Sequence, residues 1–494
     1  MAGALACLWS ILPRRAASAL RVLGARRIVA FTLLPAFLGV TVEQFGSLAL
    51  YGLQEWYHAL VSGHNDTPVL TATRFVEAKD LPLRTLGTWL VDNHDQRVRL
   101  RCVNWYGAHL ETLVVGGLDK QPLAKLAFTI RALGFNCVRL PYSLELQLRP
   151  TRPKQDFLIA NPELLNASGL EILDKTVAAL AAARILVVLN NHQGSAMWCC
   201  SESDGEGLWY TPEYPEQAWL DSLRSLTARY RDEPFVIGYD LRNELRSALL
   251  PIPTGTSERF TPDWGSGDND TDWAAAALRG ALAVSEKDPK ALLFVEGLNF
   301  ATDLSGVRSG GRLHKHPELH GRVVYEAHDY CWYHPELLVA WCFHWISIGW
   351  ALCLLWDVLR NRNLKGHPRG DVRYFRIAVV IALSISWSVS TWLASYWHFA
   401  AVISSRWGFL IEEGEAPLWL GEFGTNGPWV TVDRWMEVGE VTWWRHIVRY
   451  IREHEVDYAY WAINGDKAGE DETFGLLTHD YATLRHPWIV EALP

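Results

Sequence analysis

The chain lacks several features that define common classes of protein. Only 20% of its 494 residues are charged, the formal net charge is −9, and no long basic stripe runs through the central region. This composition argues against nucleic acid as the main partner and favours an uncharged or weakly charged substrate. The eight cysteines lack metal-ligand spacing: Cys199 and Cys200 are adjacent, while Cys342 and Cys353 lie in an apolar run. We expect no zinc site, and the spacing does not determine a disulfide pairing.

Tryptophan is abundant, with 25 residues, and 49% of all residues are hydrophobic. Indole rings stack on the apolar faces of sugars, and they also gather at membrane interfaces. Both explanations remain open at this point. Trp105, Trp198 and Trp209 are candidates for sugar stacking, although core packing explains a tryptophan at least as often.

The N-terminal segment has the layout of a signal anchor. Residues 1–42 contain no acidic side chain but several arginines, and the stretch 28–42 is apolar. That stretch is shorter than the ~20 residues needed to span a bilayer, so a cleaved signal peptide or an organelle transit peptide are alternatives.

Two long apolar runs lie in the second half of the chain. Residues 337–356 and 377–403 contain no Lys, Arg, Asp or Glu, and the loop 360–376 between them is strongly basic. This pattern predicts a transmembrane hairpin with a cytoplasmic loop. The alternative is a pair of buried helices in a large core.

We therefore predict four segments: a targeting or membrane anchor at 1–55, catalytic barrel at 56–334 and 406–494, and an inserted hairpin at 335–405. The basic N-terminus and the basic loop would lie on one side of the membrane. The catalytic domain would then be lumenal or extracellular. Three N-x-S/T triplets, at Asn65, Asn166 and Asn269, fall within the segment placed on that side.

Outside the hairpin, short apolar runs alternate with amphipathic helical stretches, as in βα units. The expected strands are one ending near Asn104, then 136–142, 185–192, 236–244, 291–297, 322–330, 418–424 and 458–464. Eight such strands predict a closed parallel (β/α)₈ barrel. A doubly wound sheet is the alternative, which is disfavoured because no Gly-rich phosphate turn follows the first strand.

Catalytic groups of an α/β barrel project from the carboxyl ends of its strands. Each strand-end residue has an ordinary structural explanation on its own, so the inference rests on the ordered set. Glycoside hydrolysis requires two carboxyl groups that flank the scissile bond, and Glu244 and Glu422 have suitable neighbours. Asn243 can bind the sugar 2-hydroxyl, a contact that strengthens in the transition state.

The remaining strand-end residues complete a sugar site. His328 and Tyr330 are two apart, so on one strand they would face the same side. Tyr330 can then bind the nucleophilic carboxylate, and Arg139 can keep it ionised. His192 can bind a sugar hydroxyl, and Trp461 can support the ring being cleaved.

This ordered set resembles family 5 of the glycoside hydrolases, a large family with the acid/base and the nucleophile on strands four and seven. The stretches GFNCVRLPYS, AMWCCSESDGEGLWY and VIGYDLRNELR resemble a cellulase-like branch found in plants and other eukaryotes. The resemblance implies retention of configuration, β-linked substrates, and no metal or other cofactor. It also implies a covalent glycosyl-Glu422 intermediate, with Glu244 as acid and then base.

Several functions are compatible with these residues. The leading hypothesis is hydrolysis of β-glucosyl-type bonds in a polysaccharide. The inserted hairpin favours a membrane glycolipid, such as glucosylceramide or a steryl glucoside, as the alternative substrate. Transglycosylation would use the same residues, and a catalytically silent carbohydrate-binding membrane protein is the alternative from another class.

Overall fold

The computed structural model describes residues 73–494 except 202, 252–254, 361–369, 427–438 and 468. The expected N-terminal anchor lies outside these residues. The chain forms two compact units. The barrel unit is drawn from Val69–Tyr333, Ala400–Pro428 and Trp444–Pro494, and a helical unit is drawn mainly from His334–Phe399.

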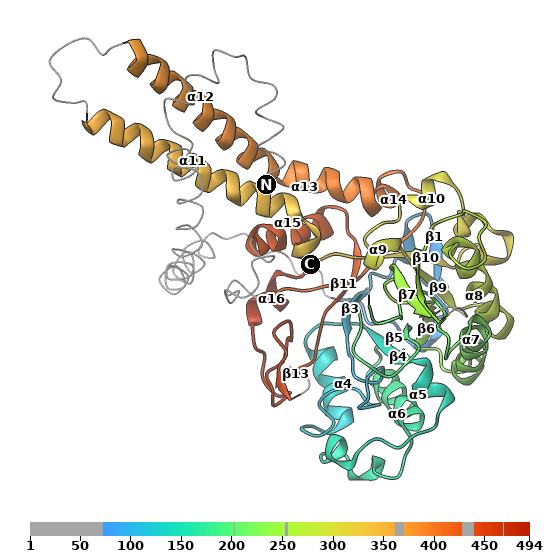
Figure 1. The fold of residues 1–494 in the computed structure, drawn as a ribbon. Coiled ribbons are helices and arrows are strands. Elements are labelled where there is room, and N and C mark those ends of the chain that lie inside the picture. Colours follow the sequence, from blue (N-terminus) through green and yellow to red (C-terminus); the bar gives the residue numbers. More distant parts are fainter. Residues whose placement is uncertain (1–72, 202, 252–254, 361–369, 427–438, 468) are drawn as a thin grey trace. The chain divides into compact units, whose positions relative to one another are not determined.

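A closed barrel of eight parallel strands forms the centre of the barrel unit (Figure 1). Its strands follow one another around the barrel in chain order, which confirms the predicted (β/α)₈ architecture. The strands are β3 (Arg101–Asn104), β4 (Cys137–Ser143), β5 (Leu186–Gln193), β6 (Val236–Asp240), β9 (Leu292–Glu296), β10 (Val323–His328), β11 (Leu418–Phe423) and β12 (Asp457–Tyr460).

Five strands end earlier than the sequence suggested, by one residue in β9 and β11 and by more in β6, β10 and β12. β6 stops at Asp240, so Glu244 lies beyond the strand, and its φ of 46° is a left-handed conformation outside the β region. β10 stops at His328, so Tyr330 lies beyond the strand rather than on it. β12 stops at Tyr460, immediately before Trp461.

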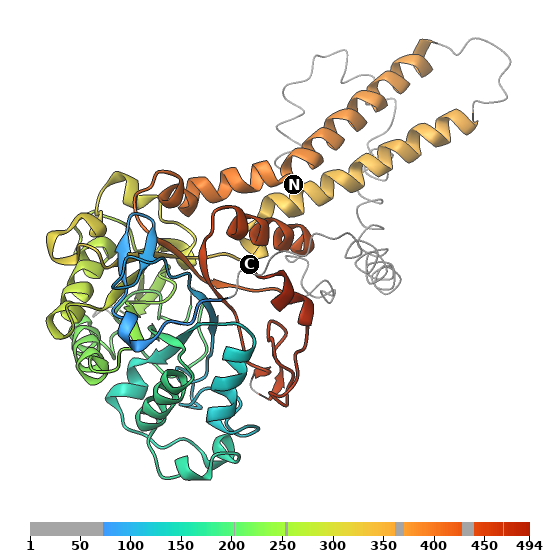
Figure 2. The same cartoon turned by 180° about the vertical axis from the view of Figure 1, so that it is seen from behind.

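Amphipathic helices surround the strands, and their ends follow local sequence signals (Figures 1 and 2). Ser168 and Glu171 form a capping box at the start of one helix, and the Asp272 carboxylate accepts the Ala275 N–H at the start of another. The main helices are α4 (Leu123–Ala132), α6 (Gly169–Ala182), α7 (Glu216–Tyr230), α8 (Trp273–Lys287) and α15 (Glu440–Glu453).

Apolar side chains from several strands fill the base of the barrel. Val188, Phe294 and Trp419 belong to one buried cluster there, together with Cys102 and Cys137. These two cysteines are register partners on β3 and β4, and they form a buried disulfide.

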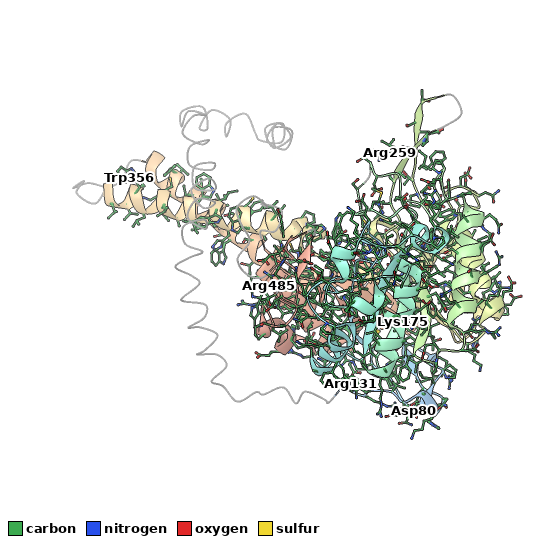
Figure 3. All side chains as sticks on the ribbon, turned by 90° about the horizontal axis from the view of Figure 1, so that it is seen from below. Asp80, Arg131, Lys175, Arg259, Trp356 and Arg485 are labelled. Carbon is green, nitrogen blue, oxygen red and sulfur yellow. A yellow bond between two sulfur atoms is a disulfide. The ribbon has the colours of Figure 1, made fainter. Side chains whose placement is uncertain are left out.

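Shorter elements connect the barrel segments. An antiparallel hairpin of β7 (Ala248–Pro251) and β8 (Ser257–Phe260) follows β6 and carries the exposed Arg259 (Figure 3). The others are β1 (Arg84–Leu86), β2 (Trp89–Val91), β13 (Asp466–Lys467), β14 (Glu470–Asp471), α5 (Leu144–Leu148), α9 (Leu298–Ala301), α10 (Gly306–Ser309), α14 (Phe409–Glu412) and α16 (Pro487–Ala492).

The helical unit contains two long helices, α11 (Pro335–Arg360) and α12 (Gly370–Leu393), which lie side by side (Figure 2). Ser347 and Ser386 are hydrogen-bonded at 2.7 Å, and Arg376 pairs with Asp357 at 2.7 Å, so the helices are antiparallel. Both are long and apolar enough to cross a membrane by length and composition.

The second apolar run does not form one continuous helix. α12 ends at Leu393, and α13 (Tyr396–Ile403) begins after a short break. The Ser395 hydroxyl accepts the His398 N–H at 3.2 Å, which satisfies an amide at the start of α13. A local capping serine therefore divides a stretch that hydropathy alone shows as uninterrupted.

Candidate active site

The strand-end residues predicted from the sequence meet at one end of the barrel and are all buried. They come from the ends of six strands or from the residues that follow them, as expected for the carboxyl face of this architecture. Arg139 lies on β4, His192 on β5, Asn243 and Glu244 shortly after β6, His328 at the end of β10, Tyr330 two residues later, Glu422 on β11 and Trp461 directly after β12.

His328 connects the two glutamates. Its Nδ1 lies 3.0 Å from Glu244 Oε1 and 3.9 Å from Glu422 Oε2. One donor atom from each of these three side chains lies within 4.8 Å of the other two. The structure therefore brings together two carboxyl groups that are 178 positions apart in the numbering, 422 − 244.

The backbone of Glu244 is held from both sides. Its N–H donates to Glu296 Oε2 at 2.6 Å, and its carbonyl accepts Arg246 Nη1 at 2.8 Å. A non-glycine residue with positive φ costs on the order of 1–3 kcal/mol, so it persists only where its surroundings enforce it. Here these two hydrogen bonds supply that enforcement.

The two glutamates have different electrostatic surroundings. Burial raises the pKa of Glu244 to about 7, and the positive charges of Arg246 and Arg139 oppose that rise. Burial also raises the pKa of Glu422, whereas His328 and Arg139 lower it. Arg139 Nη1 donates directly to Glu422 Oε1 at 2.5 Å, which favours the ionised carboxylate at this position.

Tyr330 and Arg139 make the contacts to Glu422 that the sequence suggested. The Tyr330 hydroxyl donates to Glu422 Oε2 at 3.2 Å, while Arg139 holds Oε1. Tyr330 reaches the carboxylate although it lies past the end of β10. Its predicted contact is present, but strand alternation is not the reason for it.

Three buried carboxyl groups around Arg139 were not predicted. Arg139 binds Asp240 at 2.8 Å, Glu296 at 2.9 Å and Glu326 at 3.1 Å, in addition to Glu422. All three are fully buried. Their positions in the sequence could have indicated them. Asp240 and Glu296 are the last residues of β6 and β9, and Glu326 lies two residues before His328 on β10.

The buried carboxyl groups of Glu326 and Glu296 both have raised pKa values. Burial and the charge of Asp240 raise the pKa of Glu326 well above its ordinary value, and the charge of Arg139 opposes that rise. Burial and the neighbouring carboxylates raise the pKa of Glu296 as well. Burial beside other carboxyl groups therefore favours the neutral form of both side chains more than in an exposed glutamate.

Gly421, the residue before Glu422, makes room for the side chain of Glu326. A Cβ atom on Gly421 would lie 1.8 Å from Glu326 Oε1. No side chain fits there without displacing Glu326, so glycine is required by the close approach of β10 and β11.

His192 and Asn243 lie beside a disulfide that sequence spacing could not predict. Cys199 and Cys200 are bonded to each other. His192 Nε2 lies 3.3 Å from Cys199 Sγ, and Asn243 Nδ2 lies 3.5 Å from Cys200 Sγ. Asn243 Oδ1 accepts Arg139 Nη2 at 2.8 Å, so its NH₂ group faces away from the guanidinium.

Aromatic rings line one side of the site. Trp461 stacks on Tyr106 with ring centroids 5.1 Å apart, and His192 is nearly parallel to Trp461. Of the three other candidate tryptophans, Trp105 and Trp209 are buried core residues, whereas Trp198 is 41% exposed. The Lys467 ammonium lies over the Trp198 ring, 3.7 Å from its centroid.

Three clusters within the described chain place potential metal ligands within 4.8 Å of one another: Glu244, His328 and Glu422; Glu296, Glu326 and His328; and His192, Cys199 and Cys200. In the first two, the guanidinium of Arg139 already binds Glu422 or Glu296 and Glu326, and a divalent cation would have to sit beside this buried positive charge. The third contains the disulfide.

Two buried carboxyl groups therefore lie close together at one end of a (β/α)₈ barrel, and sequence comparison identifies the family. Residues 92–467 match the model described as Cellulase (glycosyl hydrolase family 5). The chain belongs to glycosyl hydrolase family 5, whose members are glycosidases, and the resemblance seen in the sequence is confirmed.

Curated relatives agree with this assignment. A glycosyl hydrolase 5 family protein from Chamaecyparis obtusa is 29% identical, with the alignment covering 84% of this chain and 65% of that protein. An endoglucanase from Paenibacillus polymyxa is 26% identical over 82% of this chain and 84% of its own length.

Solved structures show the same fold. The catalytic domain of the major endoglucanase from Xanthomonas campestris pv. campestris is 25% identical, with a TM-score of 0.60 over 83% of this chain and 98% of that domain. A complex of the Pyrococcus horikoshii endocellulase with cellotetraose is 22% identical, with a TM-score of 0.59 over 84% and 98% of the two chains.

Proposed function

We propose that this protein hydrolyses β-glucosyl bonds of a polysaccharide with retention of configuration. The proposal rests above all on the proximity of Glu244 and Glu422. Retaining glycosidases keep their two carboxyl groups ~5–5.5 Å apart, whereas inverting enzymes leave ~6.5–9.5 Å for a water molecule. Carboxylate oxygens of Glu244 and Glu422 within 4.8 Å of each other support the retaining class.

In the first step, Glu422 attacks the anomeric carbon while Glu244 donates its proton to the leaving oxygen. The C–O bond to the leaving group breaks as the bond to Glu422 forms. In the second step, Glu244 takes a proton from water, and the resulting oxygen nucleophile displaces Glu422 from the same carbon. The pKa of about 7 suits a group that must donate and then accept a proton.

The surrounding residues orient these steps. Arg139 and Tyr330 each hold one oxygen of Glu422, which aims the carboxylate and stabilises its charge when the glycosyl bond breaks. The NH₂ group of Asn243 is available for the sugar 2-hydroxyl. Trp461 offers a ring face to the sugar bound at the point of cleavage.

Two observations bear on the substrate: the names of the relatives and the exposed apolar side chains of the helical unit. Two of the most similar curated proteins are named endoglucanases, which supports a β-glucan. A β-glucosyl glycolipid is the second candidate, because apolar side chains on α11 and α12 are widely exposed, including the labelled Trp356 at 64% (Figure 3). Transfer to a sugar hydroxyl instead of water would use the same glutamates.

We further propose that α11 and α12 form a membrane hairpin within residues 335–405, with residues 1–55 as an anchor. Large exposed apolar patches are uncommon on monomeric soluble proteins. The exposed residues include Leu352, Leu355, Trp356, Ile381, Ile385 and Trp387. The catalytic residues would face the lumen or the exterior, where the disulfides of the barrel unit would be stable.

Hydrolysis of an aryl β-glucoside by purified protein tests the activity, and NMR of the first-formed sugar tests retention. Glu422→Ala and Glu244→Ala should both lose hydrolysis of unactivated substrates, with the exposed Glu163→Ala as a matched control. Added azide should give the α-glycosyl azide with Glu422→Ala and the β-glycosyl azide with Glu244→Ala. An α-configured first product from the wild type, or equal activity in all variants, would contradict the proposal.

The two candidate substrates are compared by offering soluble β-glucan and glucosylceramide side by side to membrane-reconstituted protein.

The location of the barrel unit is tested by removing N-linked glycans from protein made in eukaryotic cells. Asn166 and Asn269 are exposed on the barrel unit. Glycans at these two residues, lost in Asn166→Gln and Asn269→Gln, support a lumenal or extracellular barrel, and their absence opposes it.

A further inference from the structure

The Cys199–Cys200 disulfide lies within the candidate active site and is open to solvent. It contacts His192 through Cys199 and Asn243 through Cys200, and both cysteines are only half-buried. The Cys102–Cys137 disulfide, by contrast, is completely buried between two strands. A reductant therefore reaches the active-site disulfide without unfolding the barrel.

A chain of hydrogen bonds sets the orientation of His192. Asn190 Nδ2 donates to Asp240 Oδ2 at 2.6 Å, which turns Asn190 Oδ1 toward His192 Nδ1 at 2.7 Å. An amide oxygen only accepts, so Nδ1 of His192 bears the hydrogen. The lone pair of the neutral ring is then on Nε2, which faces Cys199 Sγ at 3.3 Å.

We propose that reduction of this disulfide creates a binding site for a soft divalent metal ion, formed by Cys199, Cys200 and His192. The two sulfur atoms and the ring nitrogen all lie within 4.8 Å of one another. Two thiolates and an imidazole suit Zn²⁺ or Cd²⁺, with the fourth position left to water. The Nδ1–H contact to Asn190 is the arrangement that orients a histidine ligand toward a metal.

The chemistry balances with a phosphine as reductant. The phosphine gains one oxygen from water and becomes a phosphine oxide, while the disulfide accepts two electrons and two protons to give two thiols. Binding of the metal ion then releases the two thiol protons to solvent. The ring of His192 loses no proton, because its Nε2 already presents a lone pair.

The bound ion would block catalysis at the glucosyl site. It would occupy the lone pair that His192 offers to a sugar hydroxyl, and it would hold Cys200 sulfur against the NH₂ group of Asn243. This consequence rests on the proposed glycosidase function, whereas metal binding itself does not.

The test uses the full chain and Cd²⁺ alone. Ultraviolet absorption from Cd–thiolate bonds should rise to one equivalent per chain in phosphine-treated protein and stay flat in untreated protein. Cys199→Ser/Cys200→Ser should abolish the signal. Cys342→Ser/Cys353→Ser, which removes two thiols of the helical unit, should preserve it. Asn190→Ala should weaken Cd²⁺ affinity about 10- to 100-fold, because it frees the histidine ring.

Each result is decisive. A signal that survives in Cys199→Ser/Cys200→Ser, a reduced protein that binds no Cd²⁺, or a disulfide that resists the phosphine in folded protein overturns the proposal. Glycosidase activity is measured in parallel and should fall with Cd²⁺ only after reduction. If one Cd²⁺ binds but no glycoside is ever cleaved, the metal site stands and the proposed function fails.

Discussion

Glu296 Oε2 accepts the backbone N–H of Glu244 at 2.6 Å, while its other oxygen accepts Arg139 Nη2 at 2.9 Å. A single buried carboxyl group therefore connects the backbone of the candidate acid/base to the arginine that holds Glu422. The positions of the two glutamates are coupled through this residue, although it is fully buried.

Glu296→Ala is expected to lower kcat about 10- to 100-fold with a much smaller change in KM, because leaving buried partners unsatisfied costs ~1–3 kcal/mol. Glu296→Gln keeps an acceptor oxygen and should retain more activity. Steady-state kinetics of both variants beside Glu163→Ala test this role. Equal kcat in Glu296→Ala and wild type would show that Glu296 does not position Glu244.

Activity should fall as the pH rises through about 7, because Glu244 must carry a proton to act as the acid and its pKa is raised to about 7. At low pH, protonation of Glu422 removes the nucleophile, so the profile of kcat/KM is bell-shaped. Glu244→Gln should remove the alkaline limb for an aryl glycoside whose leaving group needs no acid. An unchanged alkaline limb in that variant would assign it to another group.

Gly421→Ala should sharply reduce activity, because its Cβ would displace Glu326 from beneath Glu422. Overpacking of this kind costs ~1–3 kcal/mol. If the clash is the cause, Glu326→Ala should relieve part of the loss in the double variant. Activities and melting temperatures of the four-member cycle measure this coupling. Strictly additive losses would rule out the clash.

Asp457→Asn should stabilise the protein at pH 8. Asp457 is buried at the start of β12, and burial raises its pKa to about 7. The native state therefore binds this proton more tightly than the unfolded state, so stability falls as the pH rises from about 4 toward 7. The difference amounts to ~4 kcal/mol at most. Asparagine removes that pH dependence, which thermal melts at pH 5 and pH 8 would detect.

Ile381→Arg with Ile385→Arg should weaken membrane insertion of the helical unit. Both side chains are more than half exposed on α12, and an arginine at the centre of a span costs ~2.5–3.5 kcal/mol. The variant should appear in the supernatant after carbonate extraction, or fail to accumulate. Leu86→Arg, on the exposed face of β1, is the control and should behave as wild type. Soluble wild-type protein would refute the hairpin.

The eight strands could be predicted from the sequence because apolar runs with polar ends are a local signal. The proximity of Glu244 and Glu422 could be predicted because the carboxyl ends of parallel strands lie on one face of the barrel. Glu296 and Glu326 were missed because their role depends on which side chains meet around Arg139 across the barrel. The Cys199–Cys200 bond joins adjacent residues, and cysteine spacing alone does not show whether such a bond forms. The helix break at Ser395 depends on a capping hydrogen bond, which a hydropathy pattern does not reveal.

The most direct test of the central claim is to trap the covalent intermediate. In a 2-deoxy-2-fluoro-β-glucoside, the fluorine slows both steps, and a good leaving group restores the rate of the first step only. The glycosyl-enzyme therefore accumulates and can be isolated and mapped by mass spectrometry. The account predicts one fluoroglucosyl adduct per chain, on Glu422, and none in Glu422→Ala. An adduct on any other residue, or turnover of natural substrate with no adduct and inverted product, would contradict it.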